Sequence, residues 1–278
     1  MIIIADSGSS KTDWRLISGD GVIKEVNTSG LNPQILSGTD FVRVIRDSDL
    51  IQWPLEDIEK IYFYGAGITN KQIKVDLIRW LKSIFSNAEI EAYSDLLAAA
   101  RALYGNNSGL VGILGTGSNI GYYNGSELEK SIPILGYLLG DEGSGNALGK
   151  RLTVAFLRNE LSPTLNNEFM SFYPDYNNLL SNIYKNEQPA RLLASFVPFI
   201  HQHLESKIIG KMVEEEFTKY FRLFKKLENI SGIALIGSLA YYFKPVLEDI
   251  ALAEGLKLTK VMKSPIEALT LHHQQELT

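Results

Sequence analysis

The sequence twice places a short apolar run before a turn of small residues and a second strand-like run. The first copy runs from Ile2 to Ile17 with its turn at 6–11, and the second runs from Leu110 to Tyr123 with its turn at 115–118. Short apolar runs bounded by turn residues are typical of buried strands. The copies lie about 110 residues apart, and such a repeat indicates a duplicated supersecondary unit. We therefore expect two similar lobes.

Other segments extend each copy into an α/β pattern. Gly19-Asp20-Gly21 predicts a hairpin leading into a strand at 22–28. Further on, the pattern predicts helices at 39–47, 71–85 and 95–104 and strands at 60–64 and 89–93. Strands that alternate with helices add to a sheet in parallel. After the second copy we expect helices across 143–226, a last strand at 233–236, a helix from Leu239, and a final helix at 266–277 opened by Pro265.

The length of 278 residues suits two lobes. We expect residues 1–105 to form the first lobe and residues 106–264 the second, with the terminal helix at 265–278 able to join the first. The turn-rich segment Gly105-Asn106-Asn107-Ser108-Gly109 marks the boundary.

Composition narrows the classes of function. A net charge of -5 and a pI near 5.5 provide no basic surface for nucleic acid. The absence of cysteine removes disulfides and thiolate metal sites and is compatible with the cytoplasm, where we expect the protein. No run approaches the roughly 18 apolar residues of a membrane span, so we expect no membrane association.

The first turn, Asp6-Ser7-Gly8-Ser9-Ser10-Lys11, has the small residues that let backbone N–H groups approach an anion. A P-loop is the obvious alternative, but Ser10 occupies its second glycine position and a strand follows instead of a helix. A hairpin without function is the plain alternative. An Asp at the strand end argues against it, because Mg²⁺ needs a carboxylate there and a hairpin does not.

The second turn, Gly115-Thr116-Gly117-Ser118, misses the dinucleotide-binding glycine spacing by one residue and also precedes a strand. Gly237-Ser238 follows an apolar run as a third small-residue turn. One such turn is weak evidence. Three in one chain favour a phosphate-binding function.

Two acidic positions begin predicted helices. Asp95 and Asp141-Glu142 can each act as a helix cap or first-turn acid, which is the ordinary explanation for Asp95 alone. The functional alternative for Asp95 is a general base at the carboxyl edge of a sheet. The glycines that flank Asp141-Glu142 favour hydroxyl recognition. The four histidines lack metal-ligand spacing, and we assign them no site.

Taken in order, these segments resemble the N-acetylglucosamine kinases and the BadF/BadG/BcrA/BcrD ATPase family of the actin, hexokinase and Hsp70 superfamily. The matching segments are Ala5–Asp13, Gly30-Leu31-Asn32-Pro33, Ser94-Asp95, Leu114–Asn119, Gly140-Asp141-Glu142-Gly143-Ser144-Gly145 and Gly237-Ser238. The resemblance implies a two-lobed actin-like, ribonuclease H-like α/β fold. Each lobe would be a mixed sheet flanked by helices, with ATP in the cleft between the lobes.

The resemblance also implies a role for each matched position. Asp6 would hold Mg²⁺, and Asp95 would take the proton from the 6-hydroxyl of the sugar. The ATP and phosphate positions would be Gly8, Ser9, Ser10, Lys11, Thr116, Gly117, Gly237 and Ser238, the last two toward the adenosine. The sugar-binding positions would be Asn32, Asp95, Gly117, Ser118, Gly136 and Asp141.

The resemblance therefore predicts that the chain is an ATP-dependent kinase of N-acetylglucosamine or a related amino sugar, with ATP and Mg²⁺ as cofactors. The main alternative is an ATPase whose hydrolysis drives a protein partner. A nucleotide-binding regulator would require a lost base, whereas Asp95 is present. Leu135 stands where some animal relatives have Trp, which leaves the sugar open, and relatives of this kind leave a homodimer open. The radical-enzyme activators and the ROK kinases need cysteines that this chain lacks.

Overall fold

The computed structural model describes residues 1–19, 21, 23–227 and 231–274. By their internal contacts these residues form two compact units. The first unit comprises residues 1–108, residues 123–128 and the described chain from Ser264 onward, and the second comprises residues 109–122 and 129–263.

The first unit is built on a five-stranded mixed sheet. Its strands lie in the order β3 (Ile23–Ser29), β2 (Lys11–Ile17), β1 (Ile2–Ser7), β4 (Lys60–Gly65) and β5 (Glu89–Ser94). β2 pairs with β1 and β3 in antiparallel fashion, whereas β4 and β5 are added in parallel. The parallel strands therefore end together at one carboxyl edge.

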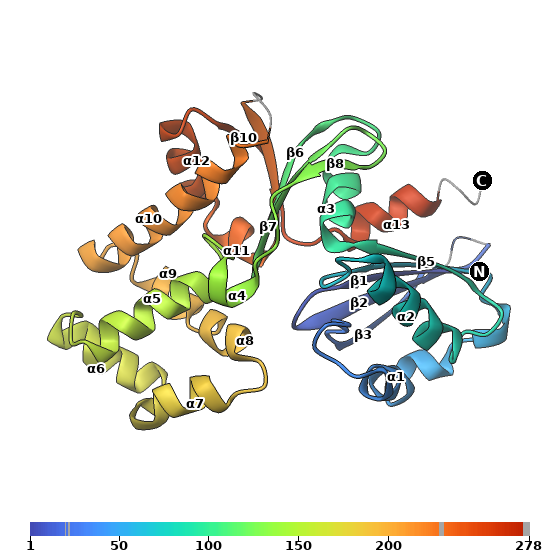
Figure 1. Cartoon of the computed structure of the whole chain (residues 1–278), viewed down its shortest axis with the longest axis horizontal. Helices are drawn as coiled ribbons and strands as arrows, with labels where there is room; N and C mark the ends of the chain where they lie inside the picture. The colour runs from blue at the N-terminus through green and yellow to red at the C-terminus, as the bar shows by residue number, and fades with distance from the viewer. Residues whose placement is uncertain (20, 22, 228–230, 275–278) are drawn as a thin grey trace. The chain divides into compact units, whose positions relative to one another are not determined.

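Helices cover both faces of this sheet (Figure 1). Residues on alternate positions of a strand point to opposite faces, so Ile3 and Ala5 pack in the core that includes α1 (Gly38–Arg46) and α2 (Lys71–Lys82). Ile2 and Ile4 pack with α3 (Asp95–Tyr104) and α13 (Ile266–Gln274). Two short 3₁₀ turns, Asp49–Gln52 and Leu55–Asp57, lead from α1 into β4.

A buried histidine anchors the C-terminal helix to the first sheet. His273 on α13 is 1% exposed, its ring stacks on Tyr62 with centroids 3.7 Å apart, and its Nε2 lies 2.8 Å from the Tyr64 hydroxyl. Arg101 on α3 donates to the same hydroxyl at 2.6 Å. Tyr64 pairs in register with Asp6. The contacts of α13 thus stabilise β4, the strand that pairs with β1 and its Asp6.

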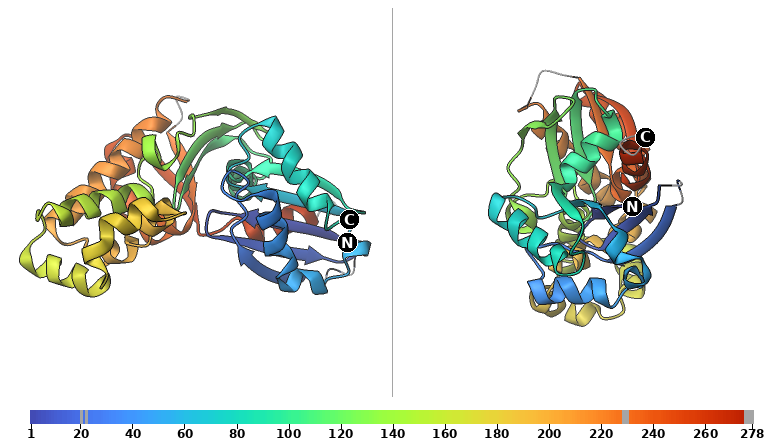
Figure 2. Two further views of the ribbon diagram at one scale, coloured as in Figure 1. Left: turned by 60° about the horizontal axis from the view of Figure 1, so that its bottom comes forward. Right: turned by 90° about the vertical axis from the view of Figure 1, so that its right-hand side faces the viewer.

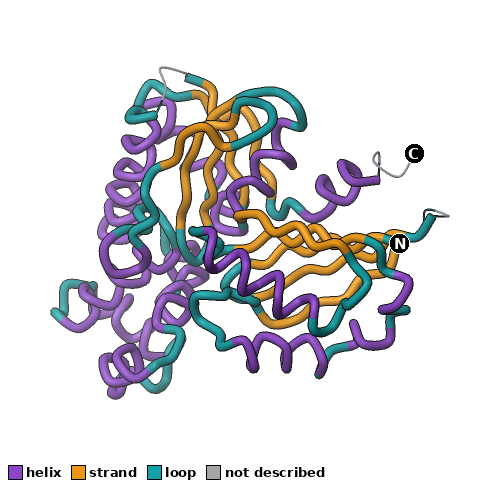
Figure 3. Tube along the Cα trace, turned by 45° about the vertical axis from the view of Figure 1, so that its right-hand side comes forward, coloured by secondary structure: helices purple, strands orange, loops and turns teal. Residues whose placement is uncertain are grey.

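The second unit repeats the topology of the first, and its strands form a second sheet, drawn in orange in Figure 3. Its strands lie in the order β8 (Leu128–Ser131), β7 (Ser118–Tyr123), β6 (Gly109–Leu114), β9 (Gly232–Ile236) and β10 (Lys257–Met262). β6, β9 and β10 are parallel. Three residues join β6 to β7, and so short a connection makes the pair antiparallel. The duplication expected from the sequence is therefore present.

A large helical block packs on the second sheet (Figure 2). The helices described in this unit are α4 (Gly136–Leu139), α5 (Gly145–Leu157), α6 (Pro163–Phe172), α7 (Leu179–Lys185), α8 (Pro189–Ala194), α9 (Val197–Gln202), α10 (Lys207–Phe224), α11 (Ser238–Tyr242) and α12 (Lys244–Ala253). Phenylalanines from α5, α6, α9 and α10 share one core with Leu110 and Leu235 of the sheet.

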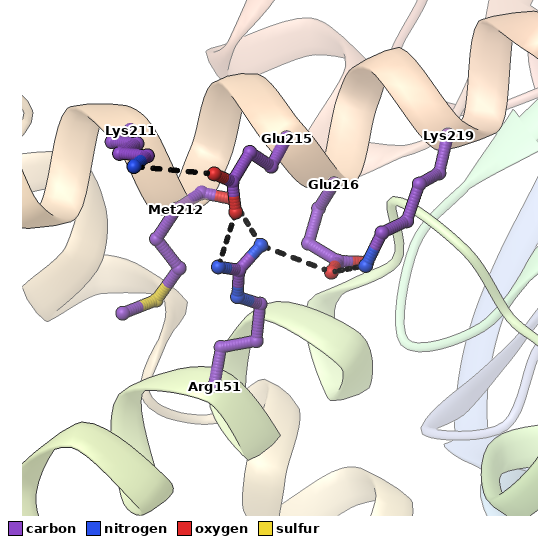
Figure 4. A network of polar contacts seen from close by, with 6 residues as sticks. All are labelled: Arg151, Lys211, Met212, Glu215, Glu216 and Lys219. Atoms are coloured by element: carbon purple, nitrogen blue, oxygen red, sulfur yellow. Dashed lines mark hydrogen bonds and ion pairs between the residues drawn. The ribbon is translucent and has the colours of Figure 1, made fainter.

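An ion-pair network joins α5 to α10 (Figure 4). Arg151 on α5 reaches Glu215 at 2.5 Å and the buried Glu216 at 3.3 Å, and Lys219 also pairs with Glu216 at 2.7 Å. A buried carboxylate is costly unless it is paired. The network therefore fixes α5, whose N-terminus lies in the candidate site, against the longest helix of the unit.

Most predicted elements are confirmed within one to three residues at their ends. Two predictions are wrong: β1 continues through Asp6 and Ser7, and 233–236 is not the last strand, because β10 follows it. Asp20, Val22 and positions 275–277 of the predicted last helix lie outside the described residues. In the part of the chain that the structure describes, no helix is long and apolar enough to cross a membrane.

Candidate functional site

Asp6 lies near the carboxyl end of β1, opposite Asp13 of β2. Facing residues on paired strands point to the same face, so the two carboxylates are neighbours. Asp13 is buried and pairs with the exposed Lys11 ammonium at 2.8 Å. The Lys11 ammonium offsets the negative charge of Asp13. The Asp13 carboxylate still lies beside that of Asp6.

The surroundings of Asp6 disfavour its charge. Burial raises the pKa of Asp6 to about 7, the neighbouring carboxylates of Asp13 and Asp95 add to the rise, and Lys11 opposes it. A group held against its preferred ionisation state is a mark of a functional site. A cation bound here would restore the charged form.

The turn between β1 and β2 is tied to the segment after β3. Gly8 N–H donates to the Lys11 carbonyl at 2.9 Å, which closes the turn. Inside it, the buried Ser7 hydroxyl accepts from Thr12 at 2.9 Å and from Leu31 N–H at 3.0 Å. A Cβ on Gly30 would lie 2.5 Å from the Gly8 carbonyl oxygen. Only glycine lets this segment lie so close behind the turn.

Asn32 lies in the next turn and contacts the loop after β4. Its Oδ1 accepts from Gln34 N–H at 2.9 Å, and the Gln34 amide donates to the Gly67 carbonyl and the Thr69 hydroxyl. Gly67 has φ +84°, and a Cβ on it would lie 2.1 Å from Asn32 Oδ1. The structure thus gathers three loops at the carboxyl edge of the first sheet.

Asp95 begins α3 at the same edge. Ser94 caps the helix by accepting from Leu97 N–H at 3.3 Å, which leaves the capping role to Ser94 and places Asp95 in the first turn. Ser94 aligns with Gly65 and, through it, with Ser7. The Asp95 carboxylate contributes to the raised pKa of Asp6, as a like charge does. The structure therefore brings Asp95 together with Asp6 and the 8–11 turn.

In the second unit, the 115–118 turn is held by the N-terminus of α5. Gly145 N–H donates to the Gly115 carbonyl at 2.8 Å. Asn146 donates twice to the Thr116 carbonyl, from its backbone N–H at 3.0 Å and from Nδ2 at 2.8 Å. These bonds fix the direction of two successive peptide groups.

Asp141 approaches the same turn from the other side. Its carboxylate accepts from Ser118 N–H at 3.3 Å and from Asn146 Nδ2 at 2.8 Å. A Cβ on Gly117 would lie 3.1 Å from this carboxylate. Burial raises the pKa of Asp141, and the hydrogen bonds from Asn146 and Ser118 oppose the rise. Its φ of +60° is rare for a residue other than glycine and marks a constrained position.

Gly237 joins the turn from the end of β9. Its φ is +125°, and a Cβ would lie 2.1 Å from the Leu114 carbonyl oxygen at the end of β6. Ser238 follows as the exposed first residue of α11. The carboxyl ends of β6 and β9 thus bring Gly237 beside the turn that starts at Gly115.

Gly136 is the first residue of α4, between β8 and α5 in the chain. Its φ is +70°, and its carbonyl accepts from Gly140 N–H at 2.9 Å. Lys150 of α5 donates to the Tyr137 carbonyl. This bond ties α4 to α5, the helix that contains Asn146.

The candidate position for Mg²⁺ is the carboxylate of Asp6. Among the described residues, no group of three or more His, Cys, Asp or Glu side chains is arranged to hold a metal ion. Mg²⁺ commonly takes one or two carboxylates and fills its shell with water and substrate phosphates. A single carboxylate with two carboxylate neighbours and a raised pKa, as at Asp6, fits that mode.

Three residues of the site, Asp13, Gly67 and Asn146, were not assigned a role from the sequence. Asp13 could have been found, since a hairpin centred between Ser9 and Ser10 places it opposite Asp6. Gly67 and Asn146 carry no comparable signal, because their contacts join segments about 30 residues apart in the chain. Their importance follows from packing alone.

Comparison with solved structures identifies the fold. The "Putative N-acetylglucosamine Kinase" from Porphyromonas gingivalis is 34% identical to this chain over the full length of both, with a TM-score of 0.91. Another protein of that description, from Chromobacterium violaceum, is 18% identical over 98% of each chain, with a TM-score of 0.74. The ROK hexokinase from Thermus thermophilus, with 15% identity and a TM-score of 0.53, shares the fold over 100% of this chain and 99% of its own. No protein-family model matches the sequence, and a search of curated proteins finds no match.

The duplicated sheet topology and these neighbours define the class: an actin-like ATPase fold with two mixed sheets flanked by helices. Within that class, the full-length match at 34% identity settles the family. The chain belongs to the N-acetylglucosamine kinase and BadF/BadG/BcrA/BcrD ATPase family.

Proposed function

We propose that this protein is an ATP-dependent kinase that phosphorylates the 6-hydroxyl of N-acetylglucosamine or a related amino sugar. The observation that carries the proposal is the grouping of Asp95, Asp6 and the Gly8–Lys11 turn at one sheet edge. Phosphoryl transfer needs positioned phosphates, neutralised charge and one group that orients the attacking hydroxyl. At this edge the Gly8–Lys11 turn is the candidate for positioning phosphates, Asp6 for holding the cation that neutralises charge, and Asp95 for orienting the hydroxyl.

Asp95 is the proposed base. It lies in the first turn of α3, where the orphan N–H groups and the helix dipole favour a carboxylate. Its carboxylate would accept the proton of the sugar hydroxyl while the hydroxyl oxygen bonds to the γ-phosphorus and the bond to the β,γ-bridging oxygen breaks. The products are the sugar 6-phosphate and ADP. A positioned base contributes roughly 10²- to 10⁴-fold to the rate of such a step.

The phosphates are assigned to small-residue turns. Ser9, Ser10 and Lys11 would line the β- and γ-phosphates, and Lys11 is exposed, with its ammonium free to turn from Asp13 toward an anion. Thr116 and Gly117 would supply N–H donors, and Gly237-Ser238 would lie toward the adenosine. Asp6 would hold Mg²⁺, directly or through water, and this ion would neutralise phosphate charge when bound.

The sugar is assigned to Asn32, Gly117, Ser118, Gly136 and Asp141. A carboxylate that is partly buried and hydrogen-bonded, as Asp141 is, has a fixed direction and suits the recognition of a hydroxyl. The name of the Porphyromonas gingivalis relative supports N-acetylglucosamine as the first candidate. A cytoplasmic location, where ATP is supplied, goes with the proposal.

The test is coupled ADP release with Mg-ATP against N-acetylglucosamine, N-acetylmannosamine, glucosamine, N-acetylmuramic acid, glucose and no sugar. We expect one amino sugar to stimulate release above the sugar-free rate. Hydrolysis that is indifferent to every sugar would reject the kinase and favour an ATPase that drives a protein partner.

A further inference from the structure

The side chain of Asn146 makes an unusual set of contacts for a residue near a helix start. Asn146 is fully buried, and Ser144 rather than Asn146 caps α5 by accepting from Ala147 N–H. Its Nδ2 donates to the Thr116 carbonyl and to the Asp141 carboxylate, each at 2.8 Å. Both partners are acceptors, so the amide orientation is fixed.

This orientation is unfavourable for the other polar atom of the amide, Oδ1. Asn146 Oδ1 is buried and has no hydrogen-bond donor among the described residues. A buried polar atom without a partner is unfavourable, and each such case in a folded protein calls for an explanation. Turning the amide over would place Oδ1 against two acceptors. The two hydrogen bonds from Nδ2 therefore determine the orientation of the side chain.

The bonds to the 115–118 turn have a geometric consequence. Among the described residues all peptide bonds are trans, and in a trans peptide the C=O and the following N–H point in opposite directions. The carbonyls of Gly115 and Thr116 point at the α5 N-terminus. The N–H groups of Thr116 and Gly117 therefore point away from α5, as two successive donors suited to an anion.

We propose that Asn146 is a positioning residue that locks the Thr116–Gly117 peptide and the Asp141 carboxylate in their working directions. The inference rests on the proposed function, in which Thr116 and Gly117 contact phosphate and Asp141 contacts the sugar. Through one amide group, Asn146 joins the phosphate-binding and sugar-binding parts of the second unit. Its loss weakens both at once.

The test compares Asn146→Ala and Asn146→Asp with matched changes at Asn166. Asn166, on α6, also has a buried Oδ1 without a hydrogen bond in the described chain, but it belongs to another part of the unit. We would measure the dissociation constant of Mg-ADP by calorimetry, the KM of the sugar, kcat, and the urea midpoint of each variant by circular dichroism.

We expect Asn146→Ala to weaken Mg-ADP binding and to raise the sugar KM, with kcat/KM lower by about 10- to 100-fold, as expected for lost hydrogen bonds to a carboxylate and a carbonyl. Asn146→Asp keeps the size but loses the donor, and it should be at least as harmful. A mere packing role predicts the opposite order, with the alanine variant worse. Asn166→Ala should leave both affinities unchanged.

The nucleotide measurement separates this inference from the proposed function. If the wild type phosphorylates no sugar, the kinase proposal fails, yet Mg-ADP affinity still tests Asn146. If Asn146→Ala is folded and binds Mg-ADP and sugar as the wild type does, Asn146 is not a positioning residue. Should Asn146→Asp fail to fold, the alanine variant alone decides.

Discussion

Asp6 should destabilise the fold at neutral and alkaline pH, so Asp6→Asn should make the protein more stable there. Its pKa is about 7 in the folded protein, against an ordinary value of 3.8. The folded state therefore binds the proton more tightly, and the free energy of unfolding falls as the pH rises from about 4 to about 7. The loss is complete above the folded pKa. Asparagine cannot ionise and avoids it.

The magnitude follows from the pKa difference. Each pKa unit corresponds to about 1.4 kcal/mol, which gives an upper limit of about 4 kcal/mol. Because the Asp6 side chain keeps partial contact with solvent, we expect a gain of about 1 to 2 kcal/mol at pH 8. At pH 4 the two proteins should be equally stable. A residue that costs stability in this way is typical of a functional site.

Urea unfolding followed by tryptophan fluorescence is the assay. The chain has three tryptophans, Trp14, Trp53 and Trp80, and all lie in the unit that contains Asp6. The exposed Asp57 of the same unit supplies a matched control, Asp57→Asn, measured under the same conditions. An Asp6→Asn protein no more stable than the wild type at pH 8 would refute the reasoning.

Substitutions at three glycines offer further predictions. Gly237→Ala places a Cβ 2.1 Å from the Leu114 carbonyl oxygen and should lower the free energy of unfolding by more than about 2 kcal/mol, with weaker Mg-ADP binding by calorimetry; Gly255→Ala, with φ +75° but open space around it, should cost only about 1 kcal/mol. An equal cost for both would show that the contact with Leu114 is unimportant. Gly30→Ala pushes on the Gly8 carbonyl at 2.5 Å and should raise the KM for ATP more than the KM for the sugar; equal changes in both would contradict our assignment of that turn.

Much of this architecture is predictable because local patterns carry it. The strand, turn, strand copies predict β1, β2, β6 and β7, and Ser94-Asp95 correctly marks the start of α3. β10 was missed because its sequence, Lys-Leu-Thr-Lys-Val-Met, is an edge strand with partly exposed residues and no apolar run. β1 extends through Asp6 because pairing with β2, rather than hydrophobicity, sets its end.

The site was predictable only in part. Positions such as Asp6, Asp95 and Asp141 are recognisable as acids at element ends, and the strand registers bring Asp6 and Asp95 to one edge. The residues that hold them are not recognisable in this way. The bond from Asn146 to Thr116 and the contact of Gly67 with Asn32 depend on how distant loops pack. The sequence around each of these residues does not indicate such contacts.

The most direct test of the central claim compares wild type with Asp95→Asn. Phosphorus NMR would follow formation of the sugar 6-phosphate from Mg-ATP, and calorimetry would measure binding of the same sugar. We expect the wild type to form the product and Asp95→Asn to lose roughly 10²- to 10⁴-fold in kcat while it still binds the sugar. Near-normal turnover by Asp95→Asn would contradict the account.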